Sequence, residues 1–176
     1  DDYSMNYFSN VKFDNYPVVN ISKESMDAYC EWLTQCYYKT GKKYSKIIVR
    51  LPSVEEWNKM ANPNNYKYFP WGTNSVFVKC KKKKNCSDSC LIANIKVDNN
   101  NNTDNSIGVN VIAQFSSTLD IGFYDIIGNV AEMTQEHIVK GGSWDNLTYE
   151  CYLKNVQNYK VPDPRVGFRI LIEIIR

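Results

Sequence analysis

The sequence predicts an α+β fold, loop-rich, with two main helices and short antiparallel strands in a single domain, residues 1–176. Helix signals occur at residues 22–39 and again from residue 53 onward, and residues 170–172 form an apolar C-terminal strand. Between these elements, residues 62–110 are dominated by proline, glycine, asparagine and other turn residues. Neither a repeat nor a linker divides the chain, and its length is sufficient for one core.

The first helix is expected to begin after Ser22, a plausible N-cap, and to end near Lys39, before Gly41. Its apolar residues recur at intervals of three and four, a spacing typical of an amphipathic helix. These residues are Met26, Tyr29, Cys30, Leu33 and Cys36 or Tyr37.

The second helix is expected to begin with a capping box, in which Ser53 accepts from the Glu56 amide and Glu56 reaches back to Ser53. Pro52 precedes this cap. Strands are expected to resume near Val109 to Phe115 and at the C-terminus, whereas the asparagine run 99–102 is expected at a loop tip.

The charge balance gives no strong field that would attract nucleic acid or a membrane surface. The formal net charge is +2, from 21 basic and 19 acidic residues. The basic run at residues 79–84 lacks aromatic or glycine-rich neighbours, which favours a solvated loop. No apolar run approaches the roughly 18 residues of a membrane span. A basic-then-apolar leader is missing as well, so we expect a cytosolic protein or one whose targeting segment has been removed.

The six cysteines bear on the cellular compartment. Cys30 and Cys36 share a predicted helix and lie about 9 Å apart along its axis, too far to bridge. In the lysine-rich loop, Cys80 could pair with Cys86 or Cys90, and oxidised loop cysteines favour an extracytoplasmic location. A zinc site is disfavoured because the chain has one histidine and no Cys-x-x-Cys pair.

Two short segments carry the most specific signal. Residues 141–145 read Gly-Gly-Ser-Trp-Asp, and residues 165–169, about twenty positions later, read Arg-Val-Gly-Phe-Arg. This pair resembles the closing signature of the formylglycine-generating enzyme family, the C-type-lectin-like sulfatase-modifying factor domain. Further segments resemble the family's blocks in the same order: residues 16–22, 26–33, 50–57, 69–72, 93–96 and 122–132.

The resemblance extends from about Tyr16 to Ile172, with the N-terminal part of the family's domain apparently shortened. A shortened domain or a mature fragment would leave a sheet edge open at the N-terminal side. Open edges invite association, so we expect assembly with a partner through this edge.

In the family, two cysteines after the Gly-Gly-Ser-aromatic block bind copper(I) and oxidise a substrate cysteine with oxygen. Here those positions fall on Asn146 and Cys151. An amide cannot replace a thiolate for copper(I), so the resemblance favours a domain without oxidase activity. If the domain were an enzyme, Cys151 and Ser143 would be its catalytic residues. The related three-histidine iron chemistry is excluded within this chain, because only His137 is present.

The resemblance also implies two calcium sites built from oxygen ligands, which suit Ca²⁺. The first would use a side-chain amide, a carboxylate and two carbonyls, at Asn94, Ile95, Asp104 and Ser106. The second would use two carboxylates and two carbonyls, at Asp125, Gly128, Val130 and Glu132.

The favoured function is a non-catalytic module that binds a protein partner or surface ligand, or that forms a structural part of a cell-envelope or secreted assembly. The asparagine-rich loops and residues 91–96 resemble the family's gliding-motility and type 9 secretion lipoprotein branch. One alternative is a copper-dependent formylglycine-generating oxidase, which requires an accessible Cys151 rather than a buried one.

The other alternative is a retroelement-diversified C-type-lectin binding protein. It predicts a set of side chains exposed together on one surface between Trp144 and Gly167. The expected binding face consists of Trp144, Asn146, Tyr149, Asn155, Asn158 and Tyr159.

Overall fold

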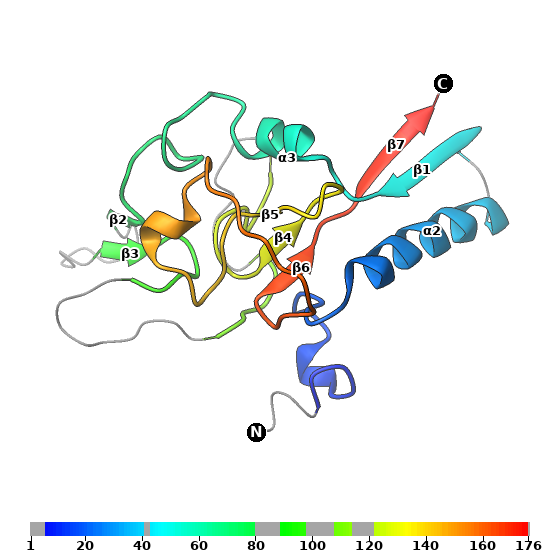
Figure 1. Cartoon of the computed structure of the whole chain (residues 1–176), viewed down its shortest axis with the longest axis horizontal. Helices are drawn as coiled ribbons and strands as arrows, with labels where there is room; N and C mark the ends of the chain where they lie inside the picture. The colour runs from blue at the N-terminus through cyan, green and yellow to red at the C-terminus, as the bar shows by residue number, and fades with distance from the viewer. Residues whose placement is uncertain (1–5, 41–42, 80–88, 98–107, 114–121, 176) are drawn as a thin grey trace.

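The computed structural model describes residues 6–40, 43–79, 89–97, 108–113 and 122–175, and confirms the loop-rich α+β class (Figure 1). No helix in these ranges is long and apolar enough to cross a membrane. In chain order the elements are η1 (Val11–Phe13), α2 (Lys23–Lys39), β1 (Lys46–Arg50), α3 (Val54–Ala61), β2 (Phe77–Lys79), β3 (Ser89–Leu91), β4 (Ala131–Met133), β5 (Val139–Lys140), η2 (Thr148–Cys151), β6 (Val166–Phe168) and β7 (Leu171–Ile175).

The strands of the described residues form three small sheets. β1 pairs with β7, β2 with β3, and β4 with β5, all antiparallel as predicted. β4 also pairs with β6, and this pairing is parallel, which the sequence did not predict. In Figure 1, α2, β1 and β7 form one end of the molecule, and the remaining strands lie toward the other end.

Helix α2 confirms the predicted first helix. The Ser22 side chain accepts from the Ser25 amide at its N-terminus. Met26 and Cys30 are buried against β1, but Tyr29 is 43% exposed, so the buried stripe is narrower than the apolar spacing predicted. The Tyr29 ring instead lies beside Phe168, with ring centroids 5.8 Å apart.

Helix α3 begins with the predicted capping box. The Glu56 amide donates to Ser53 Oγ (3.1 Å), and the Ser53 amide donates to Glu56 Oε2 (2.8 Å). Arg50, at the end of β1, donates to both Glu56 oxygens at 2.7 Å. These bonds from Arg50, with the Ser53 amide, lower the pKa of Glu56 to about 2. The start of α3 is therefore fixed to the end of β1.

The strand predicted at residues 109–115 is wrong for its described part, because residues 109–113 form no strand and end in a turn at residues 112–113. Side chains form hydrogen bonds with the backbone groups that a neighbouring strand would otherwise pair with. Asn129 Oδ1 accepts from the Asn110 amide (2.8 Å), and Asn129 Nδ2 donates to the Asn110 carbonyl (3.1 Å). Asn110 Oδ1 accepts from the Val111 amide (2.8 Å). Residues 114 and 115 lie outside the described residues.

The buried apolar side chains pack in three clusters. One surrounds Trp57 of α3, the second lies between α2 and strands β1, β4 and β6, and the third joins the N-terminal segment to Val130. Burial of these side chains is the main stabilising contribution to the fold.

Two buried charged side chains, Glu132 and Lys140, contact Trp57 inside this core. The Trp57 indole donates to Glu132 Oε2 (2.7 Å), and the Lys140 ammonium lies 5.2 Å from the Trp57 ring centroid. Lys140 is 2% exposed and donates to the carbonyls of Leu153 (2.6 Å) and Asn155 (2.9 Å). Burial lowers the pKa of Lys140 to about 8, because the charged form loses its hydration.

This shift predicts a stability that rises with pH. Between pH 8 and 10.5 the unfolded chain keeps the Lys140 proton that the folded chain has released. We expect the free energy of unfolding of the wild type, relative to Lys140→Met, to increase by about 2 kcal/mol from pH 7 to 9.5. Urea unfolding of both proteins at the two pH values measures this difference, and an unchanged or reversed difference would contradict the lowered pKa.

Candidate functional site

Two glycines allow the loop after β5 to pack closely on its neighbours, which include Cys151. Gly141 and Gly142 both have positive φ, 85° and 70°. A Cβ on Gly142 would lie 2.4 Å from Cys151 Sγ, and one on Gly141 would lie 2.5 Å from the Ile126 carbonyl oxygen. Only glycine allows this combination of backbone conformation and close approach, which explains the Gly-Gly pair in the sequence.

Cys151 lies at the end of η2 and is a free thiol with no exposed surface. Its Sγ is 3.9 Å from the Asn146 carbonyl oxygen, to which it donates a weak hydrogen bond. Burial raises the pKa of Cys151 to about 12, so the thiol stays protonated at neutral pH. Copper(I) binds the thiolate, and this environment disfavours the thiolate.

Asn146, the other position of the expected copper site, holds the loop together. Its Oδ1 accepts from both the Ser143 amide (2.9 Å) and the Ser143 hydroxyl (2.8 Å). Asn146 is 7% exposed, and Ser143 is completely buried. The Ser143 hydroxyl is therefore a structural donor, and the two residues form a buried turn beside Cys151.

The described residues contain no group of three His, Cys, Asp or Glu side chains placed to hold a metal ion. Cys30 and Cys36 are free thiols, in agreement with the prediction that they do not pair. Cys80 and Cys86 lie outside the described residues, and the Cys90 side chain is not described, so their predicted pairing stays a prediction.

Asn94 has the property that the first predicted calcium site requires. Its Nδ2 donates to the Gly108 carbonyl (2.8 Å) and lies 3.3 Å from Asn129 Oδ1, whereas its buried Oδ1 accepts no hydrogen bond. A buried amide oxygen without a donor is available to a hard cation. Asp104 and Ser106 lie outside the described residues, so the first site, with Ile95, stays a prediction.

The carboxylate predicted for the second calcium site has other partners. Arg169 donates to Glu132 Oε1 (2.6 Å) and to Oε2 (3.1 Å), and Trp57 also donates to Oε2 (2.7 Å). Nearby, the Ala113 amide donates to Asp125 Oδ2 (2.6 Å). These Glu132 oxygens do not fit a calcium ligand as they stand, because they form an ion pair with Arg169.

Gly128, another predicted ligand of this second site, has a packing role in the structure. Its φ is +78°, and a Cβ there would lie 2.3 Å from the Asn94 carbonyl oxygen. The adjacent Asn129 amide donates to that same oxygen (2.8 Å). The turn between Asp125 and Val130 is thus packed directly on the Asn94 segment, whether or not its carbonyls bind a cation.

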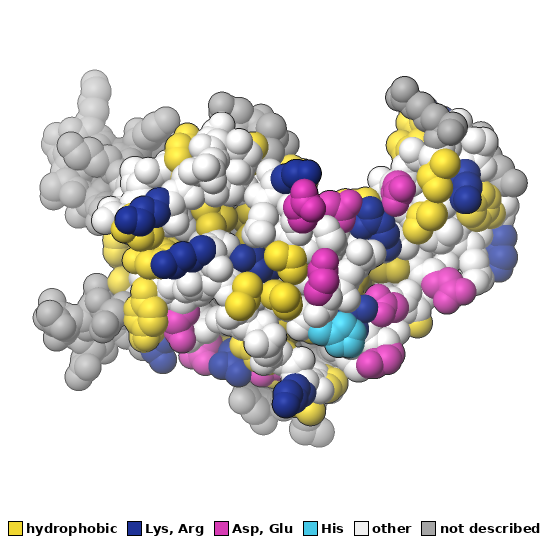
Figure 2. Space-filling model, turned by 45° about the horizontal axis from the view of Figure 1, so that its top comes forward, with side chains coloured by type: hydrophobic (Ala, Val, Ile, Leu, Met, Phe, Trp, Pro, Cys, Tyr) yellow, Lys and Arg dark blue, Asp and Glu magenta, His cyan; other side chains and the backbone are white. Residues whose placement is uncertain are grey.

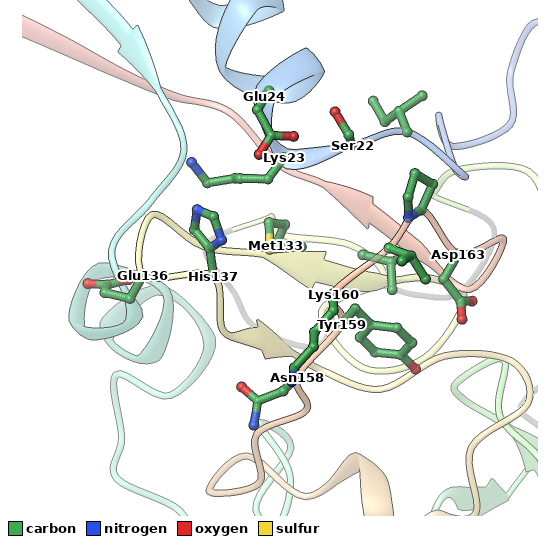
Figure 3. Close-up of a pocket in the computed structure, with 14 residues that line it drawn as sticks. Ser22, Lys23, Glu24, Met133, Glu136, His137, Asn158, Tyr159, Lys160 and Asp163 are labelled. Carbon is green, nitrogen blue, oxygen red and sulfur yellow. The ribbon is translucent and has the colours of Figure 1, made fainter.

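A surface cavity of about 500 Å³ lies away from Cys151. Its walls come from three parts of the chain that are distant in the sequence: residues 21–24 at the start of α2, Met133 at the end of β4 with Glu136 and His137 after it, and residues 158–163 with Val166. We call it the His137 cavity. Figure 3 shows His137 beneath Lys23 and Glu24, with Met133 at the back and Lys160 below. In Figure 2 the histidine lies at the surface among acidic and basic side chains.

The cavity carries charges of both signs. The pKa of Glu24 is lowered, first by its own backbone amide and by Ser22, with a smaller contribution from His137. His137 itself occupies a turn with φ of +60°. Neither Ser143 nor Cys151 lines this cavity. His137 is therefore separate from the two buried residues that would be catalytic if the domain were an enzyme.

The six residues of the predicted binding face do not share one exposed surface. Asn146 is buried, and Asn155 donates its amide to the carbonyls of Tyr149 (2.6 Å) and Glu150 (3.3 Å). Tyr149 and Asn155 line one hollow, whereas Asn158 and Tyr159 line the His137 cavity. The Trp144 side chain packs on the third core cluster.

Sequence reasoning missed the His137 cavity and the Glu132–Arg169 ion pair. No local pattern marks the cavity, because its three segments meet only after folding. The ion pair had a signal, since Glu132 and Arg169 are charged residues next to apolar strand residues. Such residues require a partner when they are buried.

Comparison with known proteins agrees with this fold. Treponema denticola variable protein 1 is similar with a TM-score of 0.65 and 18% sequence identity, over 90% of this chain and 71% of that chain. CarF is similar with a TM-score of 0.65 and 16% identity, over 96% of this chain and 71% of that chain. PvdO from Pseudomonas aeruginosa is similar with a TM-score of 0.60 and 17% identity, over 92% of this chain and 63% of that chain. A search of curated protein sequences gave no match. At these identities the likeness concerns the fold alone.

The family model of the sulfatase-modifying factor enzyme 1-like domain matches residues 6–174. This match begins earlier than the resemblance seen in the sequence, which started near Tyr16. It includes the Gly-Gly-Ser-Trp loop, the buried Cys151 and the Glu132–Arg169 pair. With nearly its whole length matched, the chain belongs to the sulfatase-modifying factor enzyme 1-like domain family.

Proposed function

We propose that this domain is a non-catalytic binding module with the formylglycine-generating enzyme fold. The observation that carries the proposal is the enclosure of Cys151, whose thiol is buried and kept protonated while Asn146 occupies the position of its copper-binding partner. An oxidase of this type needs a thiolate that copper(I) and substrate can reach. The alternative of a copper-dependent oxidase is therefore disfavoured.

The His137 cavity is the candidate ligand site of this module. Its walls combine apolar residues such as Met133 and Val166 with charged groups such as Lys160. Concave sites with an apolar lining and a few polar groups are typical of small-ligand binding. A protein partner or surface ligand with charges of both signs would fit this lining.

The cellular setting is also part of the proposal. We place the module outside the cytoplasm, in the periplasm, at the cell surface or secreted, as a component of an envelope assembly such as those of gliding motility and type 9 secretion. The support is the sequence resemblance and the expected oxidation of the loop cysteines. Fractionation of the source cells tests this location.

A second candidate function is that of a diversified binding protein. It is favoured by the similarity in fold to the structure named Treponema denticola variable protein 1. Under this proposal the varied positions would be exposed residues of the His137 cavity, such as Asn158 and Lys160, and not the buried Asn146. Sequencing of isolates would show variation concentrated at those positions. Uniform sequences there would remove this candidate.

The absence of oxidase activity is the first prediction. We expect the reduced protein to bind no copper(I) at Cys151 and to leave the cysteine of a Cys-x-Pro-x-Arg peptide unchanged under oxygen, because the thiol is enclosed. A competitive copper titration and mass spectrometry of the peptide measure both, with an active formylglycine-generating enzyme as positive control. Conversion of the peptide cysteine to an aldehyde would overturn the proposal.

Ligand binding in the His137 cavity is the second prediction. A peptide and glycan array probed with the labelled wild type identifies ligands. We expect Asn158→Lys to bind these ligands at least about tenfold more weakly, because a longer, charged side chain then lines the cavity. Val156→Lys is the matched control, since Val156 is 51% exposed and does not line the cavity. Equal loss in both variants, or none in either, would show that the ligand binds elsewhere.

We also propose calcium binding at Asn94, whose buried Oδ1 lacks a donor. Calcium at roughly 5 mM should raise the thermal midpoint of the wild type, because ligand that binds only the folded state stabilises it. Asn94→Leu should lose this response. Glu132→Gln should be less stable but keep it, since Glu132 already pairs with Arg169. A wild type that is insensitive to calcium would contradict the proposal.

A further inference from the structure

The two outer edges of the β1–β7 sheet differ. On the β1 edge, the Ile47 amide donates to Tyr38 Oη (2.9 Å) and the Tyr38 hydroxyl donates to the Ile47 carbonyl (3.0 Å). The Val49 amide donates to Thr34 Oγ1 (2.9 Å). Side chains of α2 therefore occupy this edge, and it cannot accept another strand.

The register fixes what the β7 edge presents. Because Ile47 and Val49 direct their backbone groups toward α2, the alternate residues of β1 bond to β7, in the pairs Lys46–Ile175, Ile48–Glu173 and Arg50–Leu171. Ile172 and Ile174 must then direct their N–H and C=O groups away from β1. No hydrogen bond among the described residues reaches these groups, so within this part of the chain the outer edge of β7 is unpaired.

Apolar side chains accompany this open edge. Ile172 and Ile174 pair with Val49 and Ile47 and so share the sheet face that α2 covers. The β1 residues of that face are at most 5% exposed, whereas Ile172 is 54% and Ile174 43% exposed. Helix α2 thus covers β1 and leaves β7 uncovered, at the end of the molecule seen on the right of Figure 1.

The neighbouring face of α2 is aromatic and exposed. Trp32 is 56% and Tyr29 43% exposed, and their rings lie 5.7 Å apart. Tyr29 also contacts Phe168 of β6, three residues before β7, which places the Tyr29 ring on the β6 side of the helix. We call Tyr29, Trp32, Ile172 and Ile174 the β7 patch.

We propose that the β7 patch binds a second copy of this chain, with β7 pairing antiparallel to β7 of that copy around a two-fold axis. The result is a four-stranded sheet in the order β1-β7-β7-β1, an isologous interface. This inference does not depend on the proposed binding function.

The sequence of β7 is complementary to itself in this pairing. With Ile172 opposite Ile172 of the second copy, Ile174 lies opposite Ile170, the residue directly before β7, on both sides of the axis. Leu171 then faces Glu173, and the two Glu173 carboxylates are not opposite. Each Glu173 keeps its own Arg50 (3.1 Å), so the interface buries no unpaired charge.

The spacing of the two α2 helices also suits this arrangement. Strands in a sheet lie about 4.8 Å apart, so the two β1 strands would be separated by roughly 14 Å. The two helices, which also bond to the outer edges of β1, would be at least as far apart. Directly packed helices lie about 8–10 Å apart. The wider gap requires large side chains, and Tyr29 and Trp32 of both copies supply them.

Sedimentation equilibrium of the full chain between about 1 and 300 µM tests the proposal. We expect a monomer–dimer equilibrium whose dissociation constant rises at least about tenfold in Ile172→Lys, which places two lysines at the axis. Val156→Lys is the matched control, because Val156 is 51% exposed, lies outside the β1–β7 sheet and does not line the His137 cavity. A wild type that stays monomeric, or equal effects of both variants, would overturn the proposal.

Hydrogen exchange provides a measurement that needs no variant. The amides of Ile172 and Ile174 should become protected as the protein concentration rises, whereas the Ile48 amide, already bonded within the sheet, should not change. A dimer in which these two amides exchange freely forms through another surface and would also overturn the proposal.

Discussion

The rest of the structure depends on the buried carboxylate of Glu132. It lies on β4 and accepts hydrogen bonds from Trp57 of α3 and from Arg169, which connects β6 to β7. A buried charge is tolerated only when it is paired, and removal of one partner typically costs about 3–5 kcal/mol. Three elements that are far apart in the sequence are therefore held in one arrangement, and Trp57 contacts both Glu132 and the Lys140 ammonium.

The parts of the fold that could be predicted from sequence have local causes. Ser22 and the Ser53–Glu56 pair mark helix starts because caps use residues within one turn. The failed strand at Val109 has a distant cause, since Asn129 takes the backbone groups of Asn110 from nineteen positions away. The parallel pairing of β4 with β6 is equally non-local.

The candidate site shows the same division. The motif located the loop with Asn146 and Cys151, but the burial of Cys151 depends on how closely Gly142 packs against it. The predicted binding face failed because exposure is a property of the folded loop, where Asn146 turns inward to Ser143. No spacing rule could have brought His137 beside the start of α2, because that cavity forms between three separate segments.

The hydrogen bonds of Asn146 have an evolutionary consequence. A cysteine at this position would supply a second thiolate, but it would leave the buried amide and hydroxyl of Ser143 without their acceptor. Each unsatisfied buried group costs about 1–3 kcal/mol. Since domains are only marginally stable, a protein with cysteine at position 146 and with Ser143 unchanged would have a lower free energy of unfolding. Asn146 therefore holds the Ser143 turn in place, and a cysteine could replace it without loss of stability only if another acceptor reached the Ser143 amide and hydroxyl.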